Sequence, residues 1–285
     1  MTITQISISP ALSFDVLATG EKTAPLVLLL HGFAESMHCW RAQVTALADM
    51  GYRALAPSQR GYSKGARPDP RDASHYHIDR LMDDAMAIVA ASGHGNKRFH
   101  LAGHDWGGSI AWGLADRHSE RIASLTILSR PHPNAFNRAL QIEDGDQAHR
   151  SRHHKAFLEP GAADIVLADD ARWLRERLAA NGVPQSAIEA HLVVLGNKPA
   201  MEAALAWYRA RGAIRGPLGP IRVPTLYIWG DADDTVGRIA AEGTRDFIAA
   251  PYRFEVLPGV GHFAADQAPD RVSELMLEHI RTHPA

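Results

Sequence analysis

The chain alternates short apolar runs with longer segments in which apolar residues recur every three or four positions. The short runs are bounded by turn residues and predict buried strands, at residues 25–32, 52–57, 98–103, 124–129, 225–230 and 252–259. The longer segments predict amphipathic helices, at about residues 38–50, 76–92, 107–118 and 238–249. This alternation is typical of a mostly parallel sheet covered by helices on both faces, an α/β fold. Two earlier runs, TQISISP and LSFDVLATG, suit an antiparallel hairpin that leads into the sheet.

The alternation stops between about residues 131 and 219. This stretch is rich in helix-period segments, such as ADIVLADDARWLRERLAAN and AMEAALAWYRARG, and has no strand-like run comparable to those on either side. Its apolar VVL triplet lies inside a helical pattern and is assigned to a helix. The simplest interpretation is a core of residues 1–130 and 220–285 with a helical cap (a lid) of residues 131–219 inserted into it.

Composition narrows the class of protein. The 285 residues are 46% hydrophobic, which is enough for one sizeable core. Net charge is −2 and the charges are interspersed, so the chain lacks the basic footprint of a nucleic-acid binder. We expect no signal peptide, no membrane span and, with a single cysteine, a reducing cytoplasmic location. The sequence leaves the oligomeric state open, with a homodimer as one option.

The segment GHDWG, residues 103–107, follows a predicted strand and precedes a predicted helix. It fits the pattern Gly-x-nucleophile-x-Gly, in which glycines permit a strained turn that exposes the middle side chain. Hydrolases with this turn usually carry serine there, whereas this chain carries Asp105. The alternative interpretation is that Asp105 merely caps the helix.

A carboxylate nucleophile favours a different reaction from serine. Aspartate is ionised at neutral pH and needs no base to become nucleophilic. Its attack on a saturated carbon gives an alkyl ester that activated water can cleave, whereas serine would form a stable ether. Asp105 therefore predicts displacement at a tetrahedral carbon, by opening an epoxide or expelling a halide.

Cleavage of that ester needs a base for water. His262 lies in the glycine-rich loop VLPGVGHF after the last predicted strand. A carboxylate should orient it, and GDADDTVG offers Asp233 first, then Asp234 and Asp231. The alternative is that these acids only form a turn. Backbone N–H groups of Phe33 and Trp106 are expected to stabilise the oxyanion, and His31 is expected to hold the first loop.

The motifs HGF, PSQRGYSKGARP, GHDWGG, WYRA, GDADDTVG and GVGHF occur in one order along nearly the whole chain. In this respect the sequence resembles the α/β-hydrolase superfamily, specifically its epoxide hydrolase and dehalogenase branch. The order nucleophile, acid, histidine is that of an α/β-hydrolase. The resemblance implies hydrolysis of an epoxide to a vicinal diol through a covalent alkyl-aspartate intermediate.

The resemblance also implies two cap side chains that donate hydrogen bonds to the epoxide oxygen. Tyr208 in LAWYRA matches the tyrosine motif. The second position lies upstream of FLEPG, where His153 takes the expected place with His154 beside it. Each also has a structural interpretation: His153 as an exposed residue of a basic run, and Tyr208 as packing for Trp207.

The sequence departs from the family pattern at one position and leaves two other functions open. Ala34 stands where the family's first loop generally has proline in a cis peptide, so we expect this loop to be trans or shifted.

A haloalkane dehalogenase would use the same nucleophile, and Trp106 fits its halide site, but Phe33 does not. A non-catalytic ligand-binding homologue is the other alternative. We expect a small, largely apolar organic substrate, with no cofactor and no metal.

Overall fold

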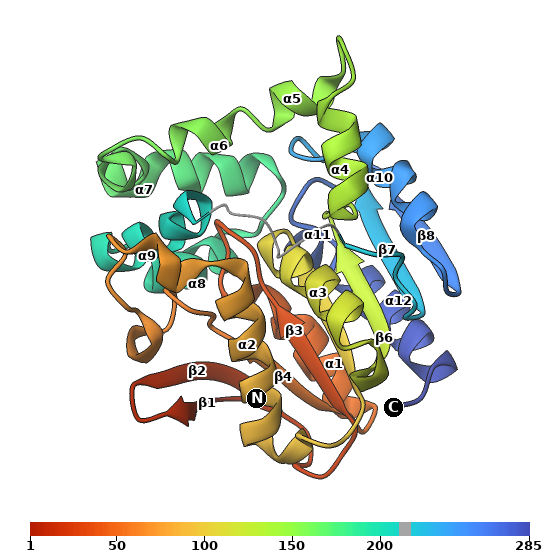
Figure 1. Ribbon diagram of the computed structural model, residues 1–285. Coiled ribbons are helices and arrows are strands. Elements are labelled where there is room, and N and C mark those ends of the chain that lie inside the picture. Colours follow the sequence, from red (N-terminus) through yellow and green to blue (C-terminus); the bar gives the residue numbers. More distant parts are fainter. Residues whose placement is uncertain (211–217) are drawn as a thin grey trace.

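The computed structural model describes residues 1–210 and 218–285. Within these residues the strands form one eight-stranded sheet in the order β1-β2-β4-β3-β5-β6-β7-β8 (Figure 1). β2 runs antiparallel to β1 and β4, and all other neighbouring strands are parallel. The strands are β1 Thr2–Ser9, β2 Leu12–Thr19, β3 Leu26–Leu30, β4 Arg53–Pro57, β5 Phe99–His104, β6 Ile122–Leu128, β7 Thr225–Gly230 and β8 Tyr252–Leu257. The expected hairpin, six strands and α/β fold are confirmed.

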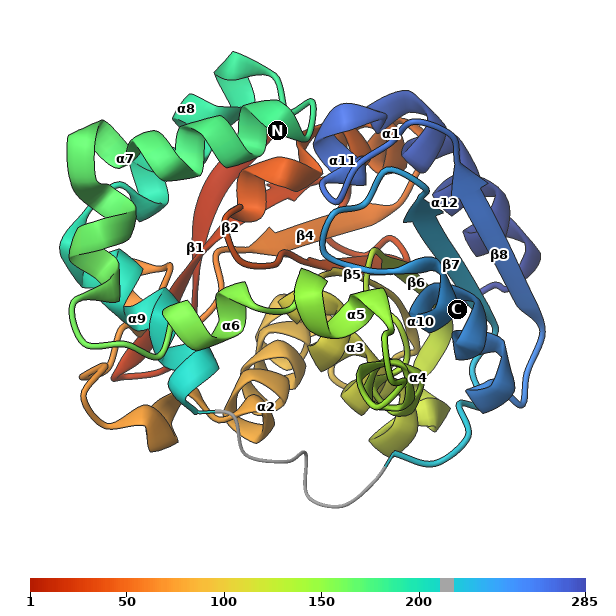
Figure 2. The same cartoon turned by 90° about the horizontal axis from the view of Figure 1, so that it is seen from above.

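Helices cover both faces of this sheet (Figure 2). They are α1 Arg41–Asp49, α2 Ile78–Val89, α3 Trp106–Arg117, α10 Arg238–Gly243, α11 Ala264–Gln267 and α12 Pro269–Thr282, with short turns η1 Met37–Trp40, η3 Ala73–Tyr76 and η6 Thr244–Phe247. The helix expected at 38–50 is split into η1 and α1. α12 was not among the expected elements, although it begins with proline and buries residues at helical spacing. None of the described helices has both the length and the apolar character needed to cross a membrane.

The side-chain alternation of β3 shows how one apolar run serves two cores. Leu26, Leu28 and Leu30 pack on the face covered by α2 and α3. Val27 and Leu29 pack on the opposite face, with residues of α1 and α12. Because a strand with both faces covered needs apolar residues throughout, its sequence shows a continuous run rather than alternation. Each such side chain contributes roughly 1.5–3 kcal/mol on burial.

Between β6 and β7 the described chain is helical, in agreement with the assignment of VVL to a helix. The helices are α4 Pro133–Leu140, α5 Asp146–Arg150, α6 His153–Ala156, α7 Ala162–Ala180, α8 Gln185–Leu195 and α9 Lys198–Arg209. α4 packs against α10 and η6, whereas α8 reaches η1, just beyond the carboxyl end of β3. The helices α5 to α9 (the helical segment) therefore lie over that end of the sheet (Figure 1). Its extent as a cap over 131–219 stays a prediction, and residues 211–217 lie outside the described residues.

Replacing Gly107 by alanine should destabilise the fold by about 2–4 kcal/mol. Its Cβ would lie 2.1 Å from the carbonyl oxygen of Leu30, and backbone atoms of β3 cannot move aside. Gly93→Ala is the control, because Gly93 has φ +89° but no atom within 4 Å of the added Cβ, so only conformational strain of about 1–2 kcal/mol applies. Urea denaturation measures both; equal losses would contradict the close contact at Gly107.

Candidate active site

Asp105 occupies a sharp turn between β5 and α3. Its backbone has φ 48° and ψ −116°, a conformation that costs a non-glycine residue about 1–3 kcal/mol. The flanking glycines permit the turn. A Cβ on Gly103 would lie 2.4 Å from the carbonyl oxygen of Gly107. The glycines of GHDWG are therefore required by backbone contact, and the turn places Asp105 at the carboxyl end of the sheet.

The Asp105 carboxylate lies between a loop and a histidine. Oδ1 accepts a hydrogen bond from the backbone nitrogen of Phe33 at 3.0 Å, and Oδ2 lies 3.8 Å from Nε2 of His262. A Cβ on Gly32 would lie 2.5 Å from the Cβ of Asp105, so the loop can approach this closely only with glycine there. The Asp105 side chain makes no capping hydrogen bond to α3. The structure thus does not show the helix cap that the alternative interpretation requires.

The loop that carries Phe33 retains its donor without proline. Every peptide bond among the described residues is trans, and Ala34 has φ +74°. This left-handed backbone turns the loop so that the Phe33 N–H still reaches Asp105. His31 holds the other side of the loop, because its Nε2 accepts a hydrogen bond from the backbone nitrogen of Gln59 at 3.1 Å.

His262 contacts one of the three candidate acids. Its Nδ1 lies 3.0 Å from Oδ2 and 3.1 Å from Oδ1 of Asp233. Asp233 also forms the turn, because Oδ1 accepts from the backbone nitrogens of Thr235 and Val236. Asp231 instead accepts from a backbone nitrogen of the β8 loop, and Asp234 pairs with an arginine. The structure therefore brings together Asp105, His262 and Asp233.

The charges of these three groups depend on one another. Burial favours a neutral His262, but the charge of Asp233 and the adjacent Asp105 outweigh it and raise the pKa of His262 to about 10. Burial also opposes ionisation of Asp105, yet the imidazole of His262 and the charge of His104 hold the pKa of Asp105 well below its usual range. At neutral pH the site therefore contains an imidazolium between two carboxylates.

Tyr208 lies above the turn. It comes from α9, is 3% exposed, and its ring packs edge-on against those of Phe33 and Trp106, with centroids 5.3 Å and 5.2 Å away. Trp106 is the first residue of α3, and the backbone N–H groups of a first helical turn point out of the N-terminal end of the helix. Tyr208 therefore covers the two residues whose N–H groups are expected to bind the oxyanion.

His153 and His154 lie beside Tyr208. Their rings are 4.3 Å apart between centroids, and the ring of His154 is 5.6 Å from that of Tyr208. His153 is close enough to the site for the charge of Asp105 to act on its pKa. The structure thus groups both histidines with Tyr208 near the candidate site.

The protonation of His153 limits what it can do. Burial, followed by the charge of Arg177, lowers the pKa of His153 to about 4. Its Nδ1 lies 3.0 Å from the carbonyl oxygen of Arg150, which can only accept. The neutral ring therefore carries its proton on Nδ1 and leaves Nε2 bare. Of Tyr208 and His153, the phenol of Tyr208 is the side chain with a proton that can be donated.

Two buried ionisable residues that the sequence analysis did not single out support the loop that carries His262. Nδ1 of His104 lies 2.8 Å from Oε2 of Glu35, and Nε2 of His104 donates to the carbonyl oxygen of His262 at 2.9 Å. Burial opposes both charges, but mutual attraction lowers the pKa of Glu35 to about 2 and raises that of His104. His104 lies inside the quoted motif GHDWG, and Glu35 follows two residues after HGF. An ionisable residue in or next to a motif was the available signal.

Arg130 is a further residue that sequence spacing did not link to the site. It follows β6, and its guanidinium carbon lies 4.7 Å from the centroid of the Phe136 ring. No carboxylate pairs with it among the described residues, and its charge contributes to keeping Asp105 ionised. The connection exists because β5 and β6 are neighbouring parallel strands, so the residues that follow them meet.

A cavity of about 540 Å³ opens beside His153. It is lined by Asp146, His149, Arg150, Arg152, His153, Trp173, Arg177 and Asp234. Most of its lining residues are polar or charged, and three of them are arginines. The expectation of a largely apolar substrate therefore does not extend to this cavity.

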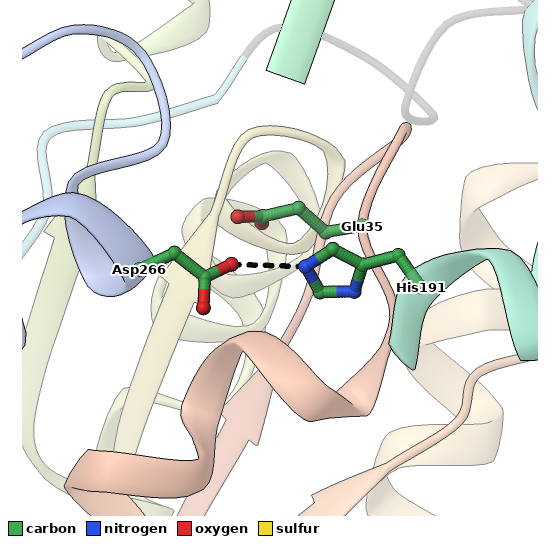
Figure 3. A group of neighbouring side chains, drawn as sticks. All are labelled: Glu35, His191 and Asp266. Atoms are coloured by element: carbon green, nitrogen blue, oxygen red, sulfur yellow. Dashed lines mark hydrogen bonds and ion pairs between the residues drawn. The ribbon is translucent and has the colours of Figure 1, made fainter. Parts of the chain in front are cut away.

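One group among the described residues has a composition that metal ions accept. Glu35, His191 and Asp266 each offer a ligand atom, and these atoms lie within 4.8 Å of one another (Figure 3). Two of them are already bonded to each other, because Nε2 of His191 and Oδ2 of Asp266 are 2.9 Å apart. Glu35 is paired with His104. We therefore interpret the group as a hydrogen-bonded cluster.

Comparison with known proteins agrees with this geometry. The family described as alpha/beta hydrolase fold matches residues 25–269. Epoxide hydrolase A of Mycobacterium tuberculosis H37Rv is 32% identical, over 93% of this chain and 93% of that protein. Epoxide hydrolase 3 of Xenopus tropicalis is 29% identical, over 94% of this chain and 74% of that protein.

A solved structure shows the same architecture. It is described as belonging to novel epoxide hydrolases of the α/β hydrolase superfamily in metagenomes from hot environments. Its chain is 28% identical and superimposes with a TM-score of 0.85, over 99% of this chain and all of that chain. Sheet order, family match and relatives agree, and this chain therefore belongs to the α/β hydrolase fold family.

Proposed function

We propose that this protein hydrolyses an epoxide to a vicinal diol through an ester formed on Asp105. The observation that carries the proposal is an ionised carboxylate at a strained turn, with a backbone N–H at 3.0 Å and a histidine at 3.8 Å. The names of the relatives support the substrate class. The helical segment acts as a cap that supplies Tyr208.

Ring opening uses the carboxylate and the cap. Oδ2 of Asp105 attacks a ring carbon, so a carbon–oxygen ester bond forms while the ring carbon–oxygen bond breaks. The departing oxygen takes the phenolic proton of Tyr208, which becomes a phenolate. The rings of His153 and Tyr208 both pack against Phe157, and the bare Nε2 of neutral His153 accepts rather than donates a hydrogen bond. Protonation of its ring is needed before it shares the donor role.

Hydrolysis uses the opposite side of the ester. After the ester has formed, His262 releases its proton to solvent. The neutral ring then takes a proton from water, and the hydroxide adds to Cγ of Asp105. The resulting oxyanion is stabilised by the N–H groups of Phe33 and Trp106. Collapse expels the diol oxygen, which takes the proton from His262. The acid proton left on Asp105 passes to His262, which restores the carboxylate and the imidazolium, and Tyr208 recovers its proton from solvent.

Ester formation also prepares the base. The ester is neutral, so the contribution of the Asp105 charge to the raised pKa of His262 is lost. Burial then favours the neutral imidazole more strongly. His262 is held as an imidazolium before ring opening, and its neutral form, which can take a proton from water, becomes more populated after ring opening.

Trapping the intermediate tests the proposed function. His262→Gln should form the ester but not cleave it, and intact-protein mass spectrometry should show a gain of one substrate mass with an epoxide from a panel of aryl and alkyl epoxides. Asp105→Asn/His262→Gln is the control and should gain nothing. Absence of an adduct with an epoxide that the wild type turns over would refute the mechanism. Halide release from haloalkanes, without diol formation from epoxides, would favour the dehalogenase alternative suggested by Trp106.

Tyr208→Phe should slow ring opening by about 10²–10⁴-fold, the usual contribution of a positioned acid. Hydrolysis of the ester should change little, because the phenol is not used there. Single-turnover quench experiments separate the two rates. Tyr252→Phe removes another buried hydroxyl, one that has no hydrogen-bond partner among the described residues, and should leave both rates as in the wild type. Equal slowing of both steps in Tyr208→Phe would contradict its role as the donor.

The hydrolysis rate should rise with pH. The form of His262 that activates water is the neutral one. The apparent pKa of this step should lie below the pKa of about 10 that His262 has in the free protein, because the ester carries no charge. Decay of the alkyl-enzyme between pH 6 and 10 measures the step, and NMR titration of His262 measures the free protein. A rate that falls as pH rises would show that His262 is not the base.

A further inference from the structure

His191 belongs to α8 of the helical segment, yet its ring contacts two loops that follow strands of the sheet. Its Nε2 lies 2.9 Å from Oδ2 of Asp266, and its Nδ1 lies 3.2 Å from the backbone nitrogen of Ser36. The Ser36 hydroxyl is 3.1 Å from the same Nδ1. The ring is fully buried. Figure 3 shows it facing Asp266, with the Glu35 carboxylate alongside.

These partners fix the position of the ring proton. A backbone N–H can only donate, so Nδ1 of His191 accepts from Ser36 and carries no proton. The proton is therefore on Nε2, which donates to Asp266. Each ring nitrogen has a different task, and a proton on Nδ1 would remove the bond to the Ser36 backbone.

The two loops carry the groups that the hydrolysis step needs. Ser36 lies three residues after Phe33, whose N–H contacts Asp105. Asp266 lies in α11, which begins two residues after His262. His191 therefore joins the loop of the oxyanion donor to the loop of the base, and joins both to the helical segment.

Buried charge makes this contact difficult to replace. Glu35 and Asp266 face one another inside the protein, and burial together with the charge of Glu35 raises the pKa of Asp266. His191 is the side chain that donates to Asp266. Without it, a buried carboxyl group would lose its donor and the Ser36 N–H its acceptor, and unsatisfied buried groups favour movement of the chain that carries them.

We propose that His191 is a positioning residue. It holds the Phe33 N–H and the His262 imidazole at the relative positions that hydrolysis of the Asp105 ester requires. The inference rests on the proposed function. Ring opening uses Asp105 and the phenol of Tyr208, whereas hydrolysis needs the base and the oxyanion donor at the same moment. His191 therefore governs the second step more than the first.

Three substitutions separate the two bonds of His191. His191→Asn can present an amide oxygen near the position of Nδ1, so it can retain the hydrogen bond from the Ser36 backbone N–H. His191→Gln can present an NH₂ group near the position of Nε2, so it can retain the hydrogen bond to Asp266. His191→Leu retains neither bond. Rapid-quench mass spectrometry measures formation and decay of the alkyl-enzyme, with the epoxide that the wild type turns over fastest.

We expect decay to slow by about 10- to 100-fold in His191→Leu, as displacements near 1 Å do in active sites, and by less in the Asn and Gln variants. Formation should change by less than about threefold on the same argument. The alkyl-enzyme should therefore accumulate, with kcat lowered while kcat/KM is retained. Val193→Asn and Val193→Gln, on the same helix at a position 81% exposed, are the controls and should behave as the wild type.

Wild-type decay in the His191 variants would overturn the positioning role, and so would equal slowing of both steps together with a lower Tm. The Asn and Gln variants decide the question even where the Leu variant does not fold. A wild-type protein that forms no alkyl-enzyme with any epoxide would contradict the proposed function, and the positioning role with it. Normal wild-type turnover with unchanged variants contradicts the positioning role alone.

Discussion

The candidate site depends on backbone atoms that approach one another without side chains between them. β5 turns into α3 so closely against β3 that a single added carbon at Gly107 would overlap the carbonyl group of Leu30. The same closeness brings the loop after β3 against Asp105, where Gly32 leaves space for the carboxylate. Through these contacts the parallel sheet determines where the carboxylate and its N–H donor lie. The covering helices, by contrast, contribute apolar packing that many sequences could supply.

Charge is the second constraint, and it acts through burial. Asp105, His262 and Asp233 are almost fully buried, so each group's charge is stabilised mainly by its neighbours rather than by water. The Glu35–His104 pair adds a further buried charge pair next to the loop that carries His262. Neutralising one member changes the proton affinity of the next. A site built this way couples its chemical steps electrostatically, without requiring a change of shape.

The sequence predicted the features that depend on local pattern. Buried strands such as β3 appear as unbroken apolar runs, and the GHDWG turn is recognisable because its glycines have a steric reason. The sequence pattern favoured Asp233 but did not exclude Asp234 or Asp231 as the partner of His262, because side-chain direction in a tight turn depends on the fold. His191 and Asp266 were missed for a different reason. Their partners lie far away in the chain, and a buried polar pair has no periodic signature.

The left-handed backbone at Ala34 has a consequence for engineering. Proteins are often stabilised by restoring residues that relatives favour, and the resemblance described above would suggest proline at this position. Proline restricts φ to about −65°, whereas Ala34 has φ +74°. Such a back-to-consensus replacement would force the loop into another path and withdraw the Phe33 N–H from the carboxylate. The loop of this chain has a different backbone conformation from the one that proline requires. Glycine is the residue best suited to the positive φ at position 34.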